Sequence, residues 1–378
     1  MKSISQLKEI RKHLHQNPEL SGEEFRTSEY IQNLLKESCP SASILKLTET
    51  GFIAHFRGEK SIPSVMLRCE LDALPIEEVN TFEHRSEIPN VSHKCGHDGH
   101  MTILLSVAFA LEKQKPAGDV YLLFQPAEET GEGAQEVLKS SAFAELPEPD
   151  FTFALHNLPG TPLHSIHVKE EEITPSVISV EIQLTGTTSH AAEPQKGKNP
   201  DLFISELLQW ANYQSQPNPQ VDNFQIITAI FVSMGSEDYG ISAGNASAGL
   251  TLRTSSNSAM ELLKERIEKK LDELSELYGI QVALKWKYSF KGVQNASIAA
   301  EYVRESAKAN DLKLVNLEAP FPWGEDYGAF TEQITGALFG LGAGEDCPAL
   351  HNPDYDFPDA LIETGSKMFQ HLIAISQK

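Results

Sequence analysis

The sequence predicts an α/β protein in which a larger domain is interrupted by an inserted ferredoxin-like α+β domain. The larger domain is expected to hold a mostly parallel sheet flanked by helices. Three observations lead to this fold class. Short apolar runs alternate with helical patterns early in the chain, strictly alternating strands occupy its middle, and buried-strand character returns later. The predicted boundaries are residues 1–173 and 293–378 for the larger domain and residues 174–292 for the insertion.

The larger domain begins with helices and strands that follow one another, the pattern of a sheet covered on both faces. Residues 5–15 and 28–36 have the helical spacing of apolar residues. A third helix fits residues 102–112, where a long apolar face ends in charged residues. Short apolar runs predict strands at residues 51–56, 65–71, 120–124, 151–155 and, after the insertion, 336–341.

The insertion has a different texture. Residues 177–185 (VISVEIQLT) alternate strictly, as a strand with one solvated face should. A helix is expected over residues 199–210, and Asn257 is expected to cap a long charged helix that ends at Leu277. The other predicted strands cover residues 224–234, 246–253 and 281–289. The resulting order β-α-β-β-α-β, over roughly 115 residues, is that of a ferredoxin-like module.

Composition narrows the classes of partner and the cellular compartment. The formal net charge of −22 disfavours nucleic acid and anionic membranes as partners. No apolar run reaches the ~20 residues of a membrane helix, and residues 1–16 lack the apolar core of a signal peptide. The cysteines (Cys39, Cys69, Cys95 and Cys347) have no CxxC spacing, which argues against a disulfide framework. We therefore expect a cytoplasmic protein whose Cys95 is a reduced thiol.

Residues 93–100 (HKCGHDGH) form the most informative segment for chemistry. They place one thiol, three imidazoles and a carboxylate around two glycines, in a loop expected just before the third helix. Thiolate and imidazole ligands suit Zn and its first-row neighbours, whereas Mg and Ca prefer oxygen. A transition-metal site needs about four ligands, so Cys95 and His97 alone do not complete one. The remaining ligands must come from elsewhere in the chain.

Polar side chains follow four of the apolar runs, and strand ends in an open α/β sheet meet at one crevice. The residues at these ends are Glu70, Asp72, Glu128, Glu129, His156, Asn157, His351 and Asn352. Neighbouring residues of an extended segment point in opposite directions, so one of Glu128 and Glu129 could bind a metal while the other faces a substrate. The sequence does not say which carboxylate has which role. Convergence of the strand ends predicts a single site.

Each of these residues also has a structural interpretation. A single histidine after a strand, such as His156 or His351, is more often a hydrogen-bonded structural residue than a ligand. Adjacent glutamates usually lie in a solvated loop, and a glycine-rich segment with histidines can be a plain turn. The functional interpretation rests on their combination, because a thiol, imidazoles and carboxylates are chemically complementary.

Taken together, these residues resemble peptidase family M20, and within it the amidohydrolase branch with its aminoacylases, hippurate hydrolases and auxin-conjugate hydrolases. The resemblance runs through nearly the whole chain. The motifs that carry it are residues 14–20 (LHQNPEL), 72–76 (DALPI), 93–100 (HKCGHDGH), 124–129 (FQPAEE), 155–156 (LH), 189–192 (SHAA), 324–327 (GEDY) and 350–351 (LH).

The resemblance implies two divalent metal ions, for which thiolate, imidazole and carboxylate ligands admit Zn, Mn, Co or Ni. It implies that the ligands are Cys95, His97, Glu129, His156 and His351. It also implies three catalytic residues, with Glu128 as the general base, Asp72 as a supporting acid and His190 as an oxyanion-stabilising donor. The larger domain would be catalytic, and the inserted domain a lid that also forms a homodimer.

The implied reaction is hydrolysis of the amide bond of an N-acyl amino acid or a related small amide. Three positions depart from the family pattern. Glu70 stands where the family usually has Asp, Gln195 replaces a histidine, and Gly240 replaces an asparagine near the third inserted strand. Two alternatives stay open, and the departures at Gln195 and Gly240 motivate the second of them. One is a dipeptidase or carboxypeptidase of the same fold, and the other is a catalytically silent protein that binds metal or a ligand.

Overall fold

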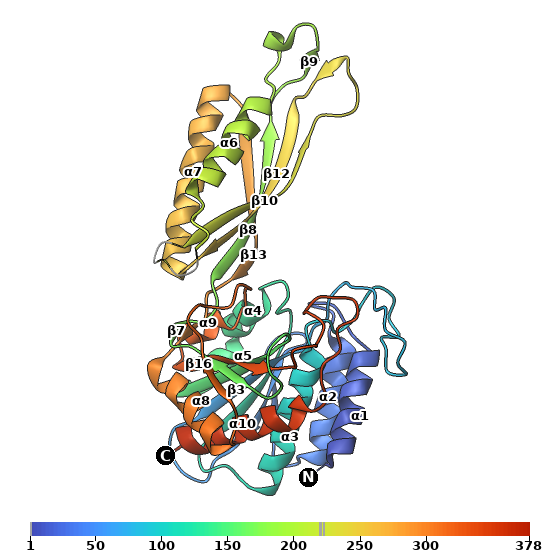
Figure 1. Cartoon of the computed structure of the whole chain (residues 1–378), viewed down its shortest axis with the longest axis vertical. Helices are drawn as coiled ribbons and strands as arrows, with labels where there is room; N and C mark the ends of the chain where they lie inside the picture. The colour runs from blue at the N-terminus through green and yellow to red at the C-terminus, as the bar shows by residue number, and fades with distance from the viewer. Residues whose placement is uncertain (1, 219–220, 222–223) are drawn as a thin grey trace. The chain divides into compact units, whose positions relative to one another are not determined.

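The computed structural model describes residues 2–218, 221 and 224–378. The chain folds into two compact units (Figure 1). The larger unit comprises Met1–Ile173, Val293–Glu318 and Glu325–Lys378, and the smaller unit comprises Thr174–Gly292 and Ala319–Gly324. The short segment Ala319–Gly324 joins the smaller unit although it lies far along the chain, and no pattern in the sequence indicates this. The smaller unit is thus an insertion into the larger one.

The larger unit is built on an eight-stranded sheet, counted over the described residues. In spatial order its strands are β1 (Ser43–Lys46), β2 (Phe52–Phe56), β4 (Val120–Gln125), β3 (Val65–Glu70), β5 (Phe151–Leu158), β16 (Gly336–Gly342), β6 (Ile166–Val168) and β15 (Leu314–Asn316). The pairs β4–β3, β3–β5, β5–β16 and β6–β15 are parallel. The pairs β1–β2, β2–β4 and β16–β6 are antiparallel. The sheet is therefore mostly parallel, which confirms that part of the predicted fold class.

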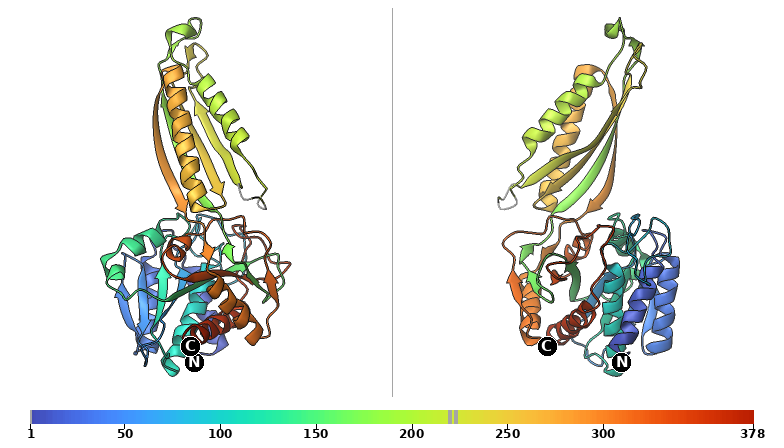
Figure 2. Two further views of the ribbon diagram at one scale, coloured as in Figure 1. Left: turned by 90° about the vertical axis from the view of Figure 1, so that its left-hand side faces the viewer. Right: turned by 45° about the vertical axis from the view of Figure 1, so that its right-hand side comes forward.

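Helices flank this sheet, as Figures 1 and 2 show. They are α1 (Ile4–Gln16), α2 (Phe25–Ser38), α3 (His97–Lys113), α4 (Gly133–Lys139), α5 (Ser141–Ala144), α8 (Ser297–Ala309), α9 (Gly328–Thr331) and α10 (Leu361–Ser376). Every residue of β3, β4 and β16 is buried, as expected for parallel strands covered on both faces. The short strands β7 (Glu171–Glu172) and β14 (Gln294–Asn295) pair beside the insertion.

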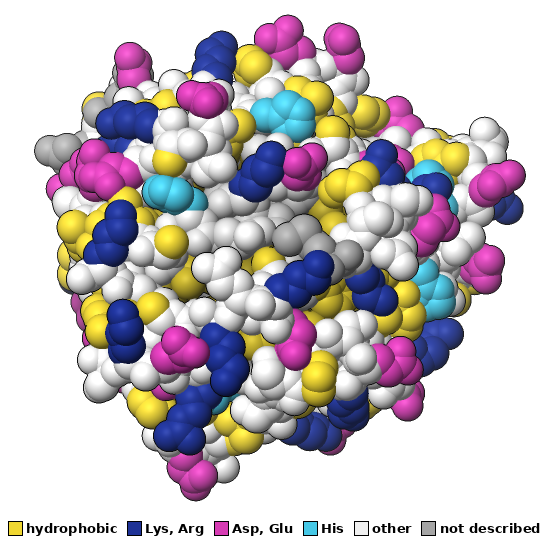
Figure 3. Space-filling model, turned by 90° about the horizontal axis from the view of Figure 1, so that it is seen from below, with side chains coloured by type: hydrophobic (Ala, Val, Ile, Leu, Met, Phe, Trp, Pro, Cys, Tyr) yellow, Lys and Arg dark blue, Asp and Glu magenta, His cyan; other side chains and the backbone are white. Residues whose placement is uncertain are grey.

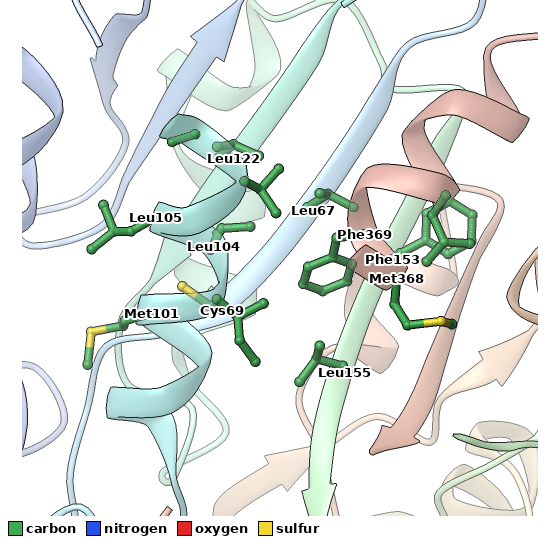
Figure 4. Close-up of a cluster of buried hydrophobic side chains, with 14 of the residues drawn as sticks. Leu67, Cys69, Met101, Leu104, Leu105, Leu122, Phe153, Leu155, Met368 and Phe369 are labelled. Atoms are coloured by element: carbon green, nitrogen blue, oxygen red, sulfur yellow. The ribbon is translucent and has the colours of Figure 1, made fainter. Parts of the chain in front are cut away.

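The core of the larger unit lies where α3 and α10 meet the central strands. Figure 4 shows side chains from α3, such as Leu104, beside Leu67 of β3, Phe153 of β5 and Phe369 of α10. Leu104 and Phe153 have no exposed surface. Truncating a leucine packed in this way to alanine typically costs about 2–5 kcal/mol of stability. This packing fixes the start of α3 and the ends of the strands that carry the polar residues.

The helix expected over residues 102–112 begins earlier, at His97. The prediction of a loop over residues 95–100 was therefore wrong from His97 onward. The first turn of α3 is polar, but its side chains are buried because they bond to neighbouring elements, Asp98 to His15 of α1 and His100 to Glu70 of β3. A buried polar turn has no apolar periodicity, so the sequence pattern placed the start of the helix too late.

The smaller unit contains a four-stranded antiparallel sheet, counted over the described residues, in the order β10-β12-β8-β13. Its main elements are β8 (Ser176–Thr185), α6 (Asp201–Gln214), β10 (Gln225–Met234), β12 (Asn245–Thr254), α7 (Asn257–Tyr278) and β13 (Gln281–Phe290). This connectivity is that of a ferredoxin-like module, which confirms the rest of the predicted fold class. Two minor strands, β9 (Ser189–His190) and β11 (Ile241–Ser242), pair with each other, and Pro194–Lys196 form a 3₁₀ turn.

The cap of α7 differs from the sequence expectation. Ser256, not Asn257, is the N-cap, and its side chain accepts a hydrogen bond from the Ala259 amide at 3.2 Å. Asn257 is the first helical residue, and its Oδ1 accepts from the Gly292 amide at 2.8 Å. Serine and asparagine are about equally good caps, so two adjacent candidates could not be told apart from sequence.

The surface carries charges of both signs. The face shown in Figure 3 has Lys and Arg side chains interspersed with Asp and Glu. The excess of acidic residues is therefore not gathered into one patch on that face. Of the helices in the described residues, none combines the length and the apolar character that crossing a membrane requires.

Candidate metal centre

The structure brings the five predicted metal ligands together at the ends of the central strands. Cys95 and His97 stand at the start of α3, Glu129 in the turn after β4, His156 in β5 and His351 in the loop after β16. Three groups of donor atoms each lie within 4.8 Å of one another. They are Cys95 with His97 and His156, Cys95 with Glu129 and His351, and His97 with Glu128 and Glu129. Shared members join these groups into one cluster.

Backbone geometry explains why these distant segments meet. His156 lies within β5, opposite Gly340 of the parallel strand β16, and not after the strand as the sequence suggested. The amide of His351, which has a φ of +65°, donates to the carbonyl of Lys94 at 2.8 Å and ties its loop to the Cys95 segment. Gly96 has a φ of +94°, and a Cβ there would lie 2.7 Å from Asn157 Oδ1. Only glycine fits this turn without strain.

Hydrogen bonds to one ring nitrogen orient two of the imidazoles. His97 Nδ1 donates to the Asp72 carbonyl at 2.9 Å, and His156 Nδ1 donates to the Asn157 carbonyl at 3.0 Å. Both Nε2 atoms are thereby turned toward the cluster, and His156 Nε2 lies 3.4 Å from Cys95 Sγ. Fixing one nitrogen in this way is how proteins prepare the other to bind a metal.

Two buried donor atoms at the centre of the cluster test whether a metal fits. Among the described residues, neither His97 Nε2 nor Glu129 Oε1 has a hydrogen-bond partner. The two atoms lie 3.9 Å apart, and His351 Nε2 is 3.8 Å from the same glutamate oxygen. Buried polar atoms without partners are costly, and a cation between them would satisfy both. The donor set therefore fits a divalent metal.

The electrostatics of the cluster point the same way. Although burial opposes it, the carboxylates of Asp72, Glu70 and Glu129 raise the pKa of His97 to about 10. Burial, together with the charge of Asp72 and against the attraction of His97, raises the pKa of Glu129 to about 7. Burial and the two glutamates also raise the pKa of the Cys95 thiol. Without a cation, the cluster holds more acidic groups than can be ionised together. A bound cation would lower the pKa values of Cys95 and Glu129 and favour their ionised forms.

Glu128 and Glu129 lie in a turn and not in an extended segment. The turn begins at Ala127, whose φ of +50° is unusual for a residue with a Cβ, and the Gly131 amide donates to the Glu128 carbonyl at 2.8 Å. Both glutamate carboxylates consequently lie 3.9 Å from His97 Nε2. The expectation that the two side chains point in opposite directions was wrong, because the alternation of a strand does not hold in a turn.

Glu128 is buried beside a second group of carboxylates. Burial and the charges of Glu325 and Glu129 raise its pKa well above the usual range. The buried Arg68 guanidinium donates to Asp326 at 2.6 Å and lies 3.0 Å from Glu325. Sequence reasoning missed this ion-pair group, because Arg68 and Asp326 are separated by 258 residues. The GEDY motif at residues 324–327 was the one signal that could have drawn attention to it.

Asp72 supports the cluster from its predicted position. It is fully buried, and its Oδ2 accepts from the Glu129 amide at 2.9 Å. Its Oδ1 lies 3.3 Å from His97 Nδ1. One carboxylate therefore fixes the backbone of one candidate ligand and the ring of another.

His93, His100 and Glu70 lie around the donor atoms. His100 Nδ1 is 2.7 Å from Glu70 Oε2, and its Nε2 is 2.6 Å from Asn157 Oδ1. Glu70 also pairs with Arg68. His93 is buried, and burial lowers its pKa to about 3 against the attraction of Asp98. Glu70, the position that departs from the family pattern, thus links the imidazole of His100 to the Arg68 group.

His190 belongs to the smaller unit, which is described by itself. It lies on β9 opposite Ile241 of β11, and its side chain is exposed. Its Nδ1 accepts a hydrogen bond from the Ala192 amide at 3.1 Å. A neutral imidazole that accepts through Nδ1 carries its proton on Nε2. His190 is therefore prepared as a hydrogen-bond donor through Nε2.

Comparison with known proteins gives close relatives over most of the chain. The sequence model of Peptidase family M20/M25/M40 matches residues 66–375. An N-acetyl-L-cysteine deacetylase of Bacillus subtilis (strain 168) is 31% identical over 363 residues, covering 94% of this chain and 85% of that protein. An N-acetylcysteine deacetylase from the same strain is 28% identical over 370 residues, covering 97% and 95% of the two chains.

Solved structures agree with this result. The Bacillus subtilis YXEP protein, a dinuclear metal-binding peptidase of the M20 family, matches with a TM-score of 0.83 and 26% identity, over 99% of this chain and 98% of its own. A putative aminohydrolase from methicillin-resistant Staphylococcus aureus matches with a TM-score of 0.88 and 20% identity, over 99% and 97%. The second likeness shows the fold alone. Both neighbours have the two-domain architecture that the sequence predicts.

Proposed function

The chain belongs to peptidase family M20/M25/M40 and is a hydrolase that acts on amide bonds, and from this premise we propose that it is a dinuclear metal-dependent amidohydrolase of N-acyl amino acids. The observation that carries the proposal is the cluster itself. A thiol, three imidazoles and a carboxylate converge within a few ångströms beside the buried carboxylate of Glu128. This combination suits metal-assisted hydrolysis.

Cys95, His97, Glu129, His156 and His351 would hold the two ions, and their donor types suit Zn, Mn, Co or Ni. Bound divalent ions polarise the substrate carbonyl and lower the pKa of water toward neutrality. The atoms His97 Nε2 and Glu129 Oε1 support this assignment. Neither has a hydrogen-bond partner among the described residues, and a bound cation would satisfy both.

Glu128 acts as the general base. It takes a proton from the attacking water, whose oxygen bonds to the amide carbon. It then gives that proton to the amide nitrogen as the C–N bond breaks, which releases an amine and a carboxylic acid, and the acid loses its proton to the amine or to solvent. The buried position of Glu128 supports this role, because a carboxylate removed from bulk water holds a transferred proton more readily.

Asp72 holds His97 and Glu129 in position through its contacts with the His97 ring and the Glu129 amide. His190 stabilises the oxyanion of the tetrahedral intermediate through Nε2–H. The Ala192 amide supports this role by holding the proton on that nitrogen. Removing one oxyanion donor costs about 3–4 kcal/mol of transition-state stabilisation in well-studied hydrolases.

The proposed substrates are small N-acetyl and N-benzoyl amino acids, and the deacetylases of N-acetylcysteine among the relatives make N-acetyl-L-cysteine the first to test. The purified protein should be loaded with Mn²⁺, Zn²⁺, Co²⁺ or Ni²⁺ and offered these substrates beside dipeptides with a free amino terminus. Turnover of the acylated substrates alone supports the proposal. Preference for dipeptides would make the protein a dipeptidase, and no turnover of any substrate with any metal would indicate a silent binding protein.

We also propose that the protein is cytoplasmic and that β10 forms a homodimer interface by pairing across a two-fold axis. β10 is an edge strand of the smaller sheet, and Ile230, Phe231, Val232 and Met234 are each at least 44% exposed along it. A long edge strand with exposed apolar side chains is a template for pairing with another strand. Light scattering at micromolar concentration should give a dimer mass, and a monomer would count against this interface.

A further inference from the structure

The turn that carries Glu128 and Glu129 is held by a residue from the N-terminal part of the chain. The amide of Ala127, the residue with a φ of +50°, donates to Glu24 Oε1 at 2.8 Å. On the other side, the Ala127 carbonyl accepts from the Gly133 amide at 3.1 Å. A non-glycine residue keeps a left-handed conformation only when its surroundings fix it. Glu24 supplies the side-chain contact that does so here.

Glu24 is itself firmly placed. It has no exposed surface and stands at the N-cap of α2. Its Oε1 also accepts from the Gly22 amide at 2.9 Å, and its Oε2 accepts from Thr50 Oγ1 at 2.9 Å. A buried carboxyl group held by two further bonds can hold a third partner without moving.

The segment of residues 21–24, which contains Glu24, also contacts Asp72, the proposed supporting acid. Ser21 Oγ donates to Asp72 Oδ2 at 2.7 Å, and that oxygen accepts from the Glu129 amide as well. Residues 21–24 therefore contact the turn at Ala127 and, through Asp72, at Glu129. This segment precedes residue 66, where the match to the family model begins.

We propose that Glu24 is a positioning residue for the hydrolysis, which sets where the carboxylates of Glu128 and Glu129 lie by holding the amide of Ala127. The inference rests on the proposed function for its catalytic consequence. It makes a separate statement about metal binding, because Glu129 is a candidate ligand and its place depends on the same turn.

The chain offers a matched control in Glu19. This residue is also a largely buried glutamate of the same segment, and its carboxylate also accepts three bonds, from Arg26 Nε, the Thr27 amide and Thr27 Oγ1. Those partners all lie at the start of α2 and not at the turn. Glu19→Ala and Glu24→Ala therefore remove similar groups, and only the second should disturb the catalytic carboxylates.

The experiment measures Mn²⁺ affinity by calorimetry, kcat and KM for the best N-acyl amino acid, and Tm, for four proteins. Relative to wild type, Glu24→Ala should lower kcat about 10- to 100-fold with little change in KM, and weaken Mn²⁺ binding about 10-fold. Glu24→Gln should stay within about 3-fold of wild type, because its carbonyl still accepts from Ala127 and its amide can donate to Thr50. Glu19→Ala should lower Tm but leave kcat and Mn²⁺ affinity unchanged.

Wild-type kcat and Mn²⁺ affinity in Glu24→Ala would overturn the inference, as would an equal loss in Glu19→Ala. If Glu24→Ala does not fold, Glu24→Asp replaces it, since the shorter carboxylate cannot reach the Ala127 amide and the same losses are expected. A wild-type protein that hydrolyses no substrate would defeat the proposed function. The Mn²⁺ titrations would still decide the positioning role, because they need no substrate.

Discussion

The candidate metal centre of the larger unit and the tip of the smaller unit (β9, β11 and Pro194–Lys196) differ in how firmly their side chains are held. At the centre, His97 and His156 are buried and each has one ring nitrogen fixed by a carbonyl. At the tip, His190 is exposed on a two-residue strand, and its imidazole accepts a hydrogen bond from the Ala192 amide. The candidate ligands therefore lie where packing is dense, whereas the proposed oxyanion donor lies on sparse structure.

The departures from the family pattern follow the same division. Gln195 and Gly240 lie at or beside the tip, where both are exposed and a changed side chain disturbs little. Glu70 lies at the centre, and its buried carboxylate contacts both Arg68 and His100. A side chain introduced at the centre must provide hydrogen-bond or charge partners for the buried groups around it, whereas one introduced at the exposed tip need not.

The largest expected effect breaks the centre. Glu128→Gln should lower kcat about 10³-fold, because an amide cannot take the proton from water, while Mn²⁺ binding stays near wild type. Steady-state kinetics with an N-acyl amino acid and calorimetric titration with Mn²⁺ measure the two quantities. Full activity in this variant would contradict the assignment of Glu128 as general base.

The next effect tests whether the tip takes part in the reaction. His190→Ala should lower kcat about 10²-fold with Mn²⁺ affinity and Tm unchanged, since the exposed side chain stabilises only the transition state. Kinetics and thermal unfolding of the variant supply these values, with Gln195→Ala as the control from the same loop. Unchanged kcat would leave catalysis to the larger unit alone and would sharpen the contrast between the regions.

Not all of this contrast could be predicted from the sequence. The strands were located well because β3, β4, β5 and β16 are continuous apolar runs, and the polar residues after them had to converge in a parallel sheet. The start of α3 was missed because its first turn is polar yet buried. Amphipathic patterns record contact with water, and they carry no information on polar groups that bond within the core.

The arrangement of charged pairs could not be predicted for a different reason. Arg68 finds Glu325 and Asp326 in a separate part of the chain, and no local pattern encodes such a pairing. The turn at Ala127 is similar, because its amide donates to Glu24, which is distant in sequence. Residue types and strand order indicate which groups meet, and only the folded structure gives the orientation in which they meet.

A third prediction concerns the buried charge network beside the centre. Although burial opposes it, Asp98 and Glu78 raise the pKa of His15 to about 9. Because this value lies above the unfolded value near 6.5, protonated His15 stabilises the fold below pH 6.5, and this contribution is lost as pH rises to 9. The loss should be on the order of 1–3 kcal/mol. Urea unfolding of the metal-free protein at both pH values measures it.

His15→Gln provides the reference, since other groups titrate in the same range. The wild-type protein should lose more stability between pH 6.5 and 9 than the variant does. Equal losses would mean that His15 is neutral in the folded protein, and the region around the centre would then depend less on paired charge than its geometry suggests.

The smallest effect on folding is expected at the exposed edge of the smaller unit. Val232→Lys should change the free energy of unfolding by less than about 0.5 kcal/mol, because the side chain already faces solvent. If β10 pairs between two chains, the same change should convert a dimer to a monomer, since lysine at an edge opposes strand pairing. Light scattering of both proteins at equal concentration tests this, and a persistent dimer would place the interface elsewhere.

The place of β16 in the sheet has a consequence for the order of events during synthesis. This strand lies between β5 and β6, both of which leave the ribosome long before it. Until β16 is made, the sheet of the larger unit lacks the strand that separates β5 from β6. Most of the smaller unit, by contrast, is one continuous stretch of the chain, and domains generally fold as units during synthesis. The gap closes only when residues 336–342 arrive, and His351 follows directly after them. A nascent chain stopped before this point would lack both an interior strand of the sheet and one candidate metal ligand, so we expect no activity before synthesis is nearly finished.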